Sequence, residues 1–135
     1  VPYRLEIGPR DVAGNQGVLV RRVDRLKETV GLDSLASEIP GRLADYQRLL
    51  FQRALDFRAT NTHLADGYDE FKGILDKEGG FIMAHWCGDG ACEKQINADT
   101  GASIRVVPFE GAEEQGSCLI DGKPSTKRVV FARAY

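Results

Sequence analysis

Three cysteines and one aspartate are spaced in a way that could bind a metal ion. Cys87 and Cys92 lie in the stretch HWCGDGAC, and Cys118 begins the stretch CLIDGK, in which Asp121 is the fourth residue. Structural zinc sites use four side chains, most often of cysteine and histidine, arranged as a tetrahedron around the ion. A carboxylate stands where a fourth cysteine would complete this pattern, and His85 is an alternative fourth ligand.

Two interpretations of these residues stay open. The first is a structural zinc site in which a strand-to-helix turn presents Cys87 and Cys92, and a hairpin presents Cys118 and Asp121. The second is that the cysteines are small buried side chains that bind nothing. A redox role is disfavoured because such dithiols have the spacing C-x-x-C, whereas four residues separate Cys87 from Cys92.

Other motifs that carry chemistry are absent from the sequence. The chain contains neither the phosphate-binding pattern G-x-x-x-x-G-K-[ST] nor the nucleophile pattern G-x-S-x-G. His63 has no obvious catalytic partner, and we interpret it as a solvated side chain near a helix end. We therefore expect no catalytic residue in this chain.

Composition and charge exclude several classes of protein. The 135 residues carry a net charge of −2, which does not by itself indicate nucleic-acid binding, although residues 1–30 hold six basic and four acidic side chains. No apolar run reaches the roughly 18 residues of a membrane helix, so no membrane partner is expected. An odd number of cysteines without a secretory signal disfavours a disulfide framework, and we expect a reducing, cytoplasmic location.

The start of the chain favours a piece of a longer protein. The first residue is Val1, and the only methionine is Met83. The opening VPYRLEI alternates as a strand without any lead-in. We expect a further domain upstream.

The periodicity of apolar residues predicts an α/β chain, of the α+β kind, in two small units. GPRD indicates a turn after the first strand, VAGNQG a loop, residues 31–40 a linker, and Asp66 a helix cap. Residues 117–120 and 127–134 are expected to pair as a closing hairpin that turns at Asp121 and Gly122. The other expected elements are strands over residues 2–7, 17–22, 27–30, 81–85 and 102–107, and helices over 41–60, 68–77 and 92–99.

Several stretches together resemble the C-terminal end of prolyl-tRNA synthetase, a class II aminoacyl-tRNA synthetase. They are VPYRLEIGPRD, FQRALDFRATNTH, GGFIMAHWCGDGACEKQINADTGASIRVVPFE and GKPSTKRVVFARAY. The resemblance implies that residues 1–35 are the last strands of an anticodon-binding domain, 36–65 a connecting helix, and 66–135 a C-terminal domain of the zinc-binding type. The catalytic domain, with ATP, Mg²⁺ and proline, would lie upstream and outside this chain.

The resemblance also implies roles for individual residues. Arg4, Arg10 and Lys27 match positions that contact the guanines of the proline anticodon, and we expect them to converge on one face. Arginine can bind the O6 and N7 atoms of an unpaired guanine with two hydrogen bonds. The alternative is a solvated strand face for Arg4 and a turn ion pair with Asp11 for Arg10.

The family pattern has four cysteine ligands, and this chain departs from it at Asp121, so the presence of zinc stays open. Tyr135 matches a C-terminal tail that reaches toward the catalytic domain. The partners implied are proline tRNA, the catalytic domain of the same protein and a second copy in a homodimer. The alternative is a purely structural or free-standing metal- or partner-binding module without RNA contact.

Overall fold

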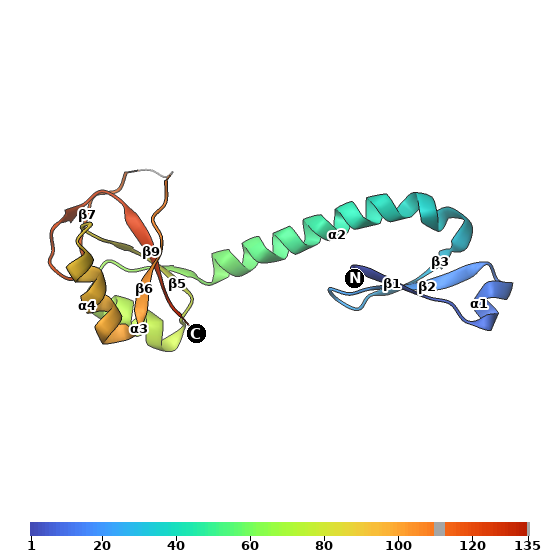
Figure 1. Ribbon diagram of the computed structural model, residues 1–135, viewed down its shortest axis with the longest axis horizontal. Helices are drawn as coiled ribbons and strands as arrows, with labels where there is room; N and C mark the ends of the chain where they lie inside the picture. The colour runs from blue at the N-terminus through green and yellow to red at the C-terminus, as the bar shows by residue number, and fades with distance from the viewer. Residues whose placement is uncertain (110–112, 135) are drawn as a thin grey trace. The chain divides into compact units, whose positions relative to one another are not determined.

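The fold is mixed α+β, as expected, and it divides into two compact units, Val1–Asp56 and Phe57–Tyr135. The computed structural model describes residues 1–109 and 113–134 of the chain (Figure 1). Within these residues, the helices are too short or too polar to cross a membrane. The expected boundaries near residues 35 and 65 stay a prediction.

The first unit contains a three-stranded antiparallel sheet in the order β1-β2-β3. Its strands are β1 (Tyr3–Glu6), β2 (Gln16–Arg21) and β3 (Lys27–Gly31), close to the expected ranges. The turn expected after β1 is instead a short helix, α1 (Pro9–Ala13). Pro9 suits the first helical position, and the Asp11 carboxylate accepts a hydrogen bond from the Gly8 amide at 2.8 Å.

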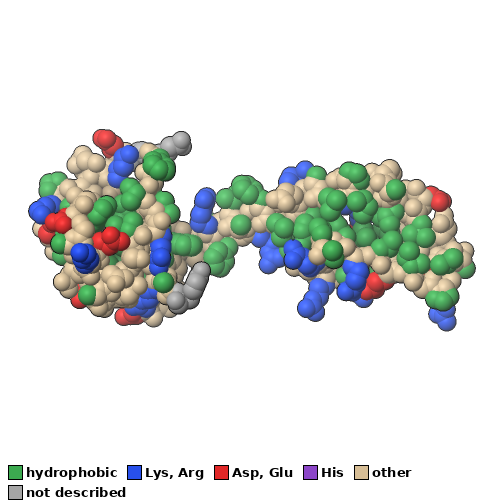
Figure 2. Space-filling view, viewed as in Figure 1, with side chains coloured by type: hydrophobic (Ala, Val, Ile, Leu, Met, Phe, Trp, Pro, Cys, Tyr) green, Lys and Arg blue, Asp and Glu red, His purple; other side chains and the backbone are tan. Residues whose placement is uncertain are grey.

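The long helix α2 (Leu32–Thr60) begins well before the position that the sequence indicated. The linker expected over residues 31–40 is wrong, because this segment is helical and packs against the sheet. Leu35 joins Leu19 and Val30 in the core of the first unit. This burial offsets the hydrogen bond that Pro40 cannot donate inside the helix. Hydrophobic side chains remain on the surface along α2 (Figure 2).

The second unit is built on a four-stranded sheet in the order β4-β5-β9-β6. The strands are β4 (Thr62–Leu64), β5 (Phe81–His85), β6 (Ala102–Val106) and β9 (Arg128–Arg133), and only the pair β4 and β5 is parallel. Helix α3 (Tyr68–Lys77) connects β4 to β5, and α4 (Gly90–Thr100) connects β5 to β6. Strand β4 was not expected.

The hairpin around Asp121 and Gly122 is present, but its strands differ from the expected ones. Strand β7 (Gly116–Ser117) pairs with β8 (Pro124–Ser125), and β9 instead lies in the sheet between β5 and β6. Gly122 has a φ of 68°, which a glycine adopts without strain. Strand β9 can occupy the middle of the sheet because Val129 and Phe131 are fully or almost fully buried.

The core of the second unit forms where α3 and α4 pack on the sheet. Phe71 of α3 meets Phe131 of β9 edge to face, with ring centroids 5.3 Å apart. Ile82 and Ile96 fill the rest of this fully buried centre. The expected cap of α3 at Asp66 is wrong, because Gly67 holds the N-cap position and the Asp66 carboxylate pairs with Arg128.

Arg128 ties four segments of the second unit together. Its side chain is only 8% exposed, and it makes two hydrogen bonds to the Glu114 carboxylate, at 2.9 and 2.6 Å. It also donates to the carbonyl oxygens of Ala65 and Met83. A buried guanidinium whose donors are all directed at oxygens is stable only while those partners stay in place.

Replacing this guanidinium by an apolar side chain should destabilise the chain. We expect Arg128→Met to lower the free energy of unfolding by about 2–3 kcal/mol, because hydrogen bonds to charged groups are lost and the carbonyl oxygens of Ala65 and Met83 each lose a donor. Urea denaturation of the 135-residue chain measures this difference. Arg48→Met is the control, since Arg48 is 73% exposed and should change stability by about 0.5 kcal/mol or less.

The effect of Arg128→Met should also depend on pH. Arg128 holds the pKa of Glu114 below its usual value of 4.5. The lowered pKa contributes stability that is fully present above that value and is lost as the pH falls through the pKa of the folded state. The difference between wild type and variant should therefore shrink in acid. An equal difference at every pH would contradict the role of the Glu114 contact.

Candidate functional site

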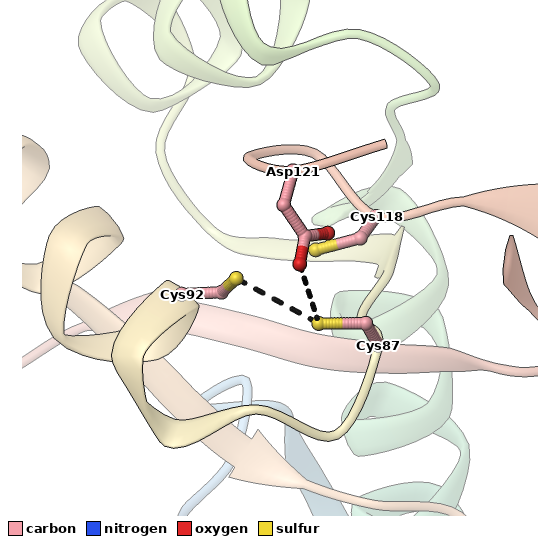
Figure 3. Close-up of side chains that lie close together, drawn as sticks. All are labelled: Cys87, Cys92, Cys118 and Asp121. Atoms are coloured by element: carbon pink, nitrogen blue, oxygen red, sulfur yellow. Dashed lines mark hydrogen bonds between the residues drawn. The ribbon is translucent and has the colours of Figure 1, made fainter. Parts of the chain in front are cut away.

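The structure brings the expected metal ligands together from three segments of the second unit. Cys87 follows β5, Cys92 lies on α4, and the turn between β7 and β8 contributes Cys118 and Asp121 (Figure 3). One ligand atom from each of the four side chains lies within 4.8 Å of every other. His85, the alternative ligand, is not a member of this group.

The distances within this cluster fit a tetrahedral zinc ion. Zinc binds sulfur at about 2.3 Å, so two sulfur ligands at the corners of a tetrahedron are about 3.8 Å apart. The Sγ atoms of Cys87 and Cys92 are 3.6 Å apart, and Asp121 Oδ2 is 3.6 Å from Cys87 Sγ (Figure 3). The donor set of three sulfurs and one carboxylate oxygen is one that zinc accepts.

Local sequence explains how both halves of the cluster are positioned. Asp89 caps α4 by accepting a hydrogen bond from the Ala91 amide at 2.9 Å, which starts the helix that carries Cys92. On the other side, the Cys118 amide donates to the carbonyl of Lys123 at 2.9 Å. This bond closes a tight loop that turns Asp121 back toward Cys118.

Within the cluster, the pKa of the Cys92 thiol is raised and the pKa of the Asp121 carboxyl group is lowered. Burial, together with hydrogen bonds to Cys87 and Cys118, raises the pKa of the Cys92 thiol to about 12. Without a metal, Cys92 therefore keeps its proton at neutral pH, and a bound zinc ion would have to displace it. The hydrogen bonds from Lys123 hold the pKa of Asp121 far below its usual range.

Lys123 is a neighbour of the cluster that the sequence did not bring to attention. Its Nζ atom is 2.9 Å from Asp121 Oδ2, the oxygen that faces Cys87. An ammonium group beside this oxygen weakens it as a ligand, but it also offsets the negative charge of three thiolates and a carboxylate around one divalent ion. The arrangement fits zinc, with a weaker fourth ligand than a thiolate.

His85 lies beside the cluster and has a structural role. Its side chain is 4% exposed, and Nδ1 lies 3.3 Å from Ser125 Oγ of β8. Gly116 of β7 lies so close to the imidazole that a Cβ atom at this position would overlap it. His85 therefore seats the hairpin that carries Cys118 and Asp121. His63, expected to be solvated near a helix end, lies on β4 just after α2 with its side chain only 23% exposed, and its Nδ1 is 3.3 Å from Glu78 Oε2.

Two of the three basic residues matched to anticodon contacts share one face of the first sheet. Arg4 and Lys27 both lie opposite Val20, on its two sides, and side chains opposite each other in a sheet point to the same face. Both are exposed, at 64% and 63%. Each also lies beside Glu6, with nitrogen-to-oxygen distances of 2.5 and 3.8 Å.

Arg10 lies apart from this pair, on the short helix α1. Its expected turn ion pair with Asp11 is not formed, because the Asp11 carboxylate accepts from the Gly8 amide. Over residues 1–109 and 113–134, the Arg10 side chain contacts no hydrogen-bond partner or carboxylate. Its convergence with Arg4 and Lys27 stays a prediction. Tyr135, the matched tail residue, lies outside the described residues.

Arg4 and Lys27 share a carboxylate, Glu6, that was not among the expected site residues. Glu6 follows Arg4 by two positions, and residues two apart in a strand lie on the same face. This signal was available in the alternation of residues 2–7. The cross-strand neighbour Lys27 required the register of the sheet.

Comparisons with known proteins agree on one family. The family model described as prolyl-tRNA synthetase, C-terminal, matches residues 68–135. A proline-tRNA ligase of Porphyromonas gingivalis is 45% identical over 135 residues, all of this chain and 27% of the relative. Similar proteins of Amoebophilus asiaticus and Natranaerobius thermophilus are 44% and 46% identical, and the chain spans 28% of each. The chain therefore belongs to the prolyl-tRNA synthetase family, and it corresponds to the C-terminal region of its members.

Proposed function

We propose that this chain is the C-terminal part of a proline-tRNA ligase, in which the first unit helps to recognise the anticodon of proline tRNA. The observation that carries the proposal is similarity over the whole chain to proteins named proline-tRNA ligase, at 44–45% identity for the first three. The chain spans just over a quarter of their length. ATP, Mg²⁺ and proline would bind in the remainder of the cytoplasmic parent enzyme, which we propose to be a homodimer.

The exposed face of the first sheet supports a role in reading unpaired bases. Arg4 and Lys27 offer cationic donors on one face, and these can reach the O6 and N7 atoms of a guanine. Their ion pairs with Glu6 are exposed, and such pairs contribute about 1 kcal/mol or less. A bound base can therefore replace Glu6 as the partner of either cation at little cost. Arg10, which has no such competitor among the described residues, would add a third contact.

Removing these side chains should weaken the discrimination between anticodons. In the full-length enzyme, we expect Arg4→Ala and Arg10→Ala each to cost about 1–3 kcal/mol of preference for the proline anticodon, because a hydrogen bond to a base edge is lost. The measurement compares kcat/KM for proline tRNA with kcat/KM for the same tRNA carrying an altered anticodon. Arg48→Ala is the control on an exposed, ion-paired arginine.

If both variants keep the wild-type preference, the assignment of Arg4 and Arg10 is wrong. A purely structural module, the second candidate function, predicts this result. Glu114 supports that alternative, because this acidic side chain forms an ion pair with Arg128 that stabilises the second unit. In that case the second unit would only brace the catalytic domain, with the tail at Tyr135 directed toward it.

The second unit is proposed to hold a structural zinc ion. Cys87, Cys92, Cys118 and Asp121 would be its ligands, and the ion would cross-link the end of β5 and the start of α4 to the hairpin. The support is the spacing of the four ligand atoms and the burial of Cys92 and Cys118. Zinc in such a closed site contributes folding free energy and no reaction step.

Metal analysis tests this assignment directly. Protein purified under reducing conditions should contain about one zinc ion per chain, and a chelator should lower the Tm because the ion binds only the folded state. Asp121→Cys should bind zinc more tightly and raise the Tm only when zinc is present. Cys92→Ser should lose the metal. A zinc content well below one per chain in the wild type would rule the site out.

A further inference from the structure

The turn between β2 and β3 is fixed by an aspartate whose charge is already neutralised. The Asp24 carboxylate receives two hydrogen bonds from the Arg21 guanidinium, at 3.0 and 2.5 Å. It also accepts from the Leu26 amide at 3.2 Å. The carboxylate of the turn is therefore already occupied by Arg21 and by the backbone.

Three further arginines lie in this turn, next to it or in contact with it. Arg22 donates from Nε to the Tyr46 hydroxyl at 3.0 Å, and its guanidinium lies 6.0 Å from the centre of the Tyr46 ring. Arg53 of α2 donates from Nη1 to the carbonyl of Val23 in the turn, at 3.2 Å. Arg25 lies in the turn itself. In the part of the chain that the structure describes, none of these three arginines contacts a carboxylate.

Arg25 holds the left-handed position of the short hairpin loop between β2 and β3. Its φ is 60°, in the left-handed region, which costs a residue with a Cβ atom roughly 1–2 kcal/mol and which glycine would occupy freely. The side chain is exposed. Its guanidinium is therefore available to a partner outside the fold.

This basic cluster is continuous with the face that carries Arg4. Arg22 and Arg4 line the same pocket, with Val20 at its floor, and the Arg22 amide donates to the carbonyl of Pro2 next to β1. Figure 2 shows lysine and arginine side chains gathered along one side of the first unit. The cluster comes from residues far apart in sequence, since Arg53 lies on the helix and the other two on the hairpin.

We propose that Arg22, Arg25 and Arg53 bind the phosphodiester backbone of RNA. A planar guanidinium matches two phosphate oxygens, and uncompensated positive charge attracts a polyanion. Because phosphates carry no sequence information, this surface would supply affinity, and the adjacent Arg4 would supply selectivity. The inference rests on the proposed function, in which the bound RNA is proline tRNA. It adds a second surface of this chain that contacts the tRNA.

The test uses Arg25→Gln and Arg53→Gln, singly and together, in the full-length enzyme. Arg22 is left in place because it packs on Tyr46. The dissociation constant is measured over a series of KCl concentrations for proline tRNA and for the same tRNA with an altered anticodon. We expect both tRNAs to lose affinity by the same factor. The slope of log K against log[salt] should fall by about 0.7–0.9 for each contact removed.

The matched control is Arg48→Gln, on the same helix and paired with Asp45. It should leave the slope unchanged. An unchanged slope in the double variant would overturn the proposal. So would a loss confined to the cognate anticodon, which would mean that these arginines read bases. A loss of tRNA-independent proline activation without a change of slope would mean that the three arginines bind an acidic protein surface. That result would also overturn the proposal.

The same data separate this inference from the proposed function. If the wild-type enzyme does not bind proline tRNA in preference to the altered one, the proposed role in anticodon recognition fails. If that preference exists but the double variant keeps the wild-type slope, only the phosphate-binding surface fails. Thermal unfolding of each variant should match the wild type, since neither side chain lies in the core.

Discussion

The hydrogen bonds of Arg128 are the constraint on which the second unit depends. One guanidinium on β9 holds the carbonyl of Ala65 after β4, the carbonyl of Met83 on β5, and the carboxylates of Asp66 and Glu114. Glu114 lies two residues before the start of strand β7, which leads to Cys118. The position of the hairpin, and with it half of the proposed metal site, is therefore linked to a charge buried beside the sheet.

The proposed metal centre joins parts that the sheet alone does not connect. Strand β5 delivers Cys87 and α4 delivers Cys92, whereas the hairpin has only two short strands of its own. Packing of His85 against Gly116 seats this hairpin through a contact that does not involve the four ligands. The ion would add a cross-link to this packing. The partly neutralised carboxylate of Asp121 makes this a weaker cross-link than a fourth thiolate would be.

The first unit divides its positive charge between two uses. Arg4 and Lys27 lie across Val20 beside Glu6, where an exposed carboxylate keeps them ordered and can be displaced. Arg22, Arg25 and Arg53 have no carboxylate among the described residues and lie in the β2–β3 turn, next to it or in contact with it. The net charge of −2 conceals this separation, because the acidic residues of the unit serve mostly as partners within the fold.

The sequence by itself determined the features that depend on neighbours a few residues apart. The bounds of α3 and β5 follow from apolar periodicity, and the spacing of Cys87, Cys92, Cys118 and Asp121 indicated the cluster that the structure assembles. The resemblance to prolyl-tRNA synthetase was visible in motifs spread over the whole chain. Only the tertiary structure decided the start of α2 at Leu32, the place of β9 inside the sheet and the contact of Arg53 with the β2–β3 turn. These depend on burial and pairing between residues far apart, and such contacts leave no periodic trace in the local sequence.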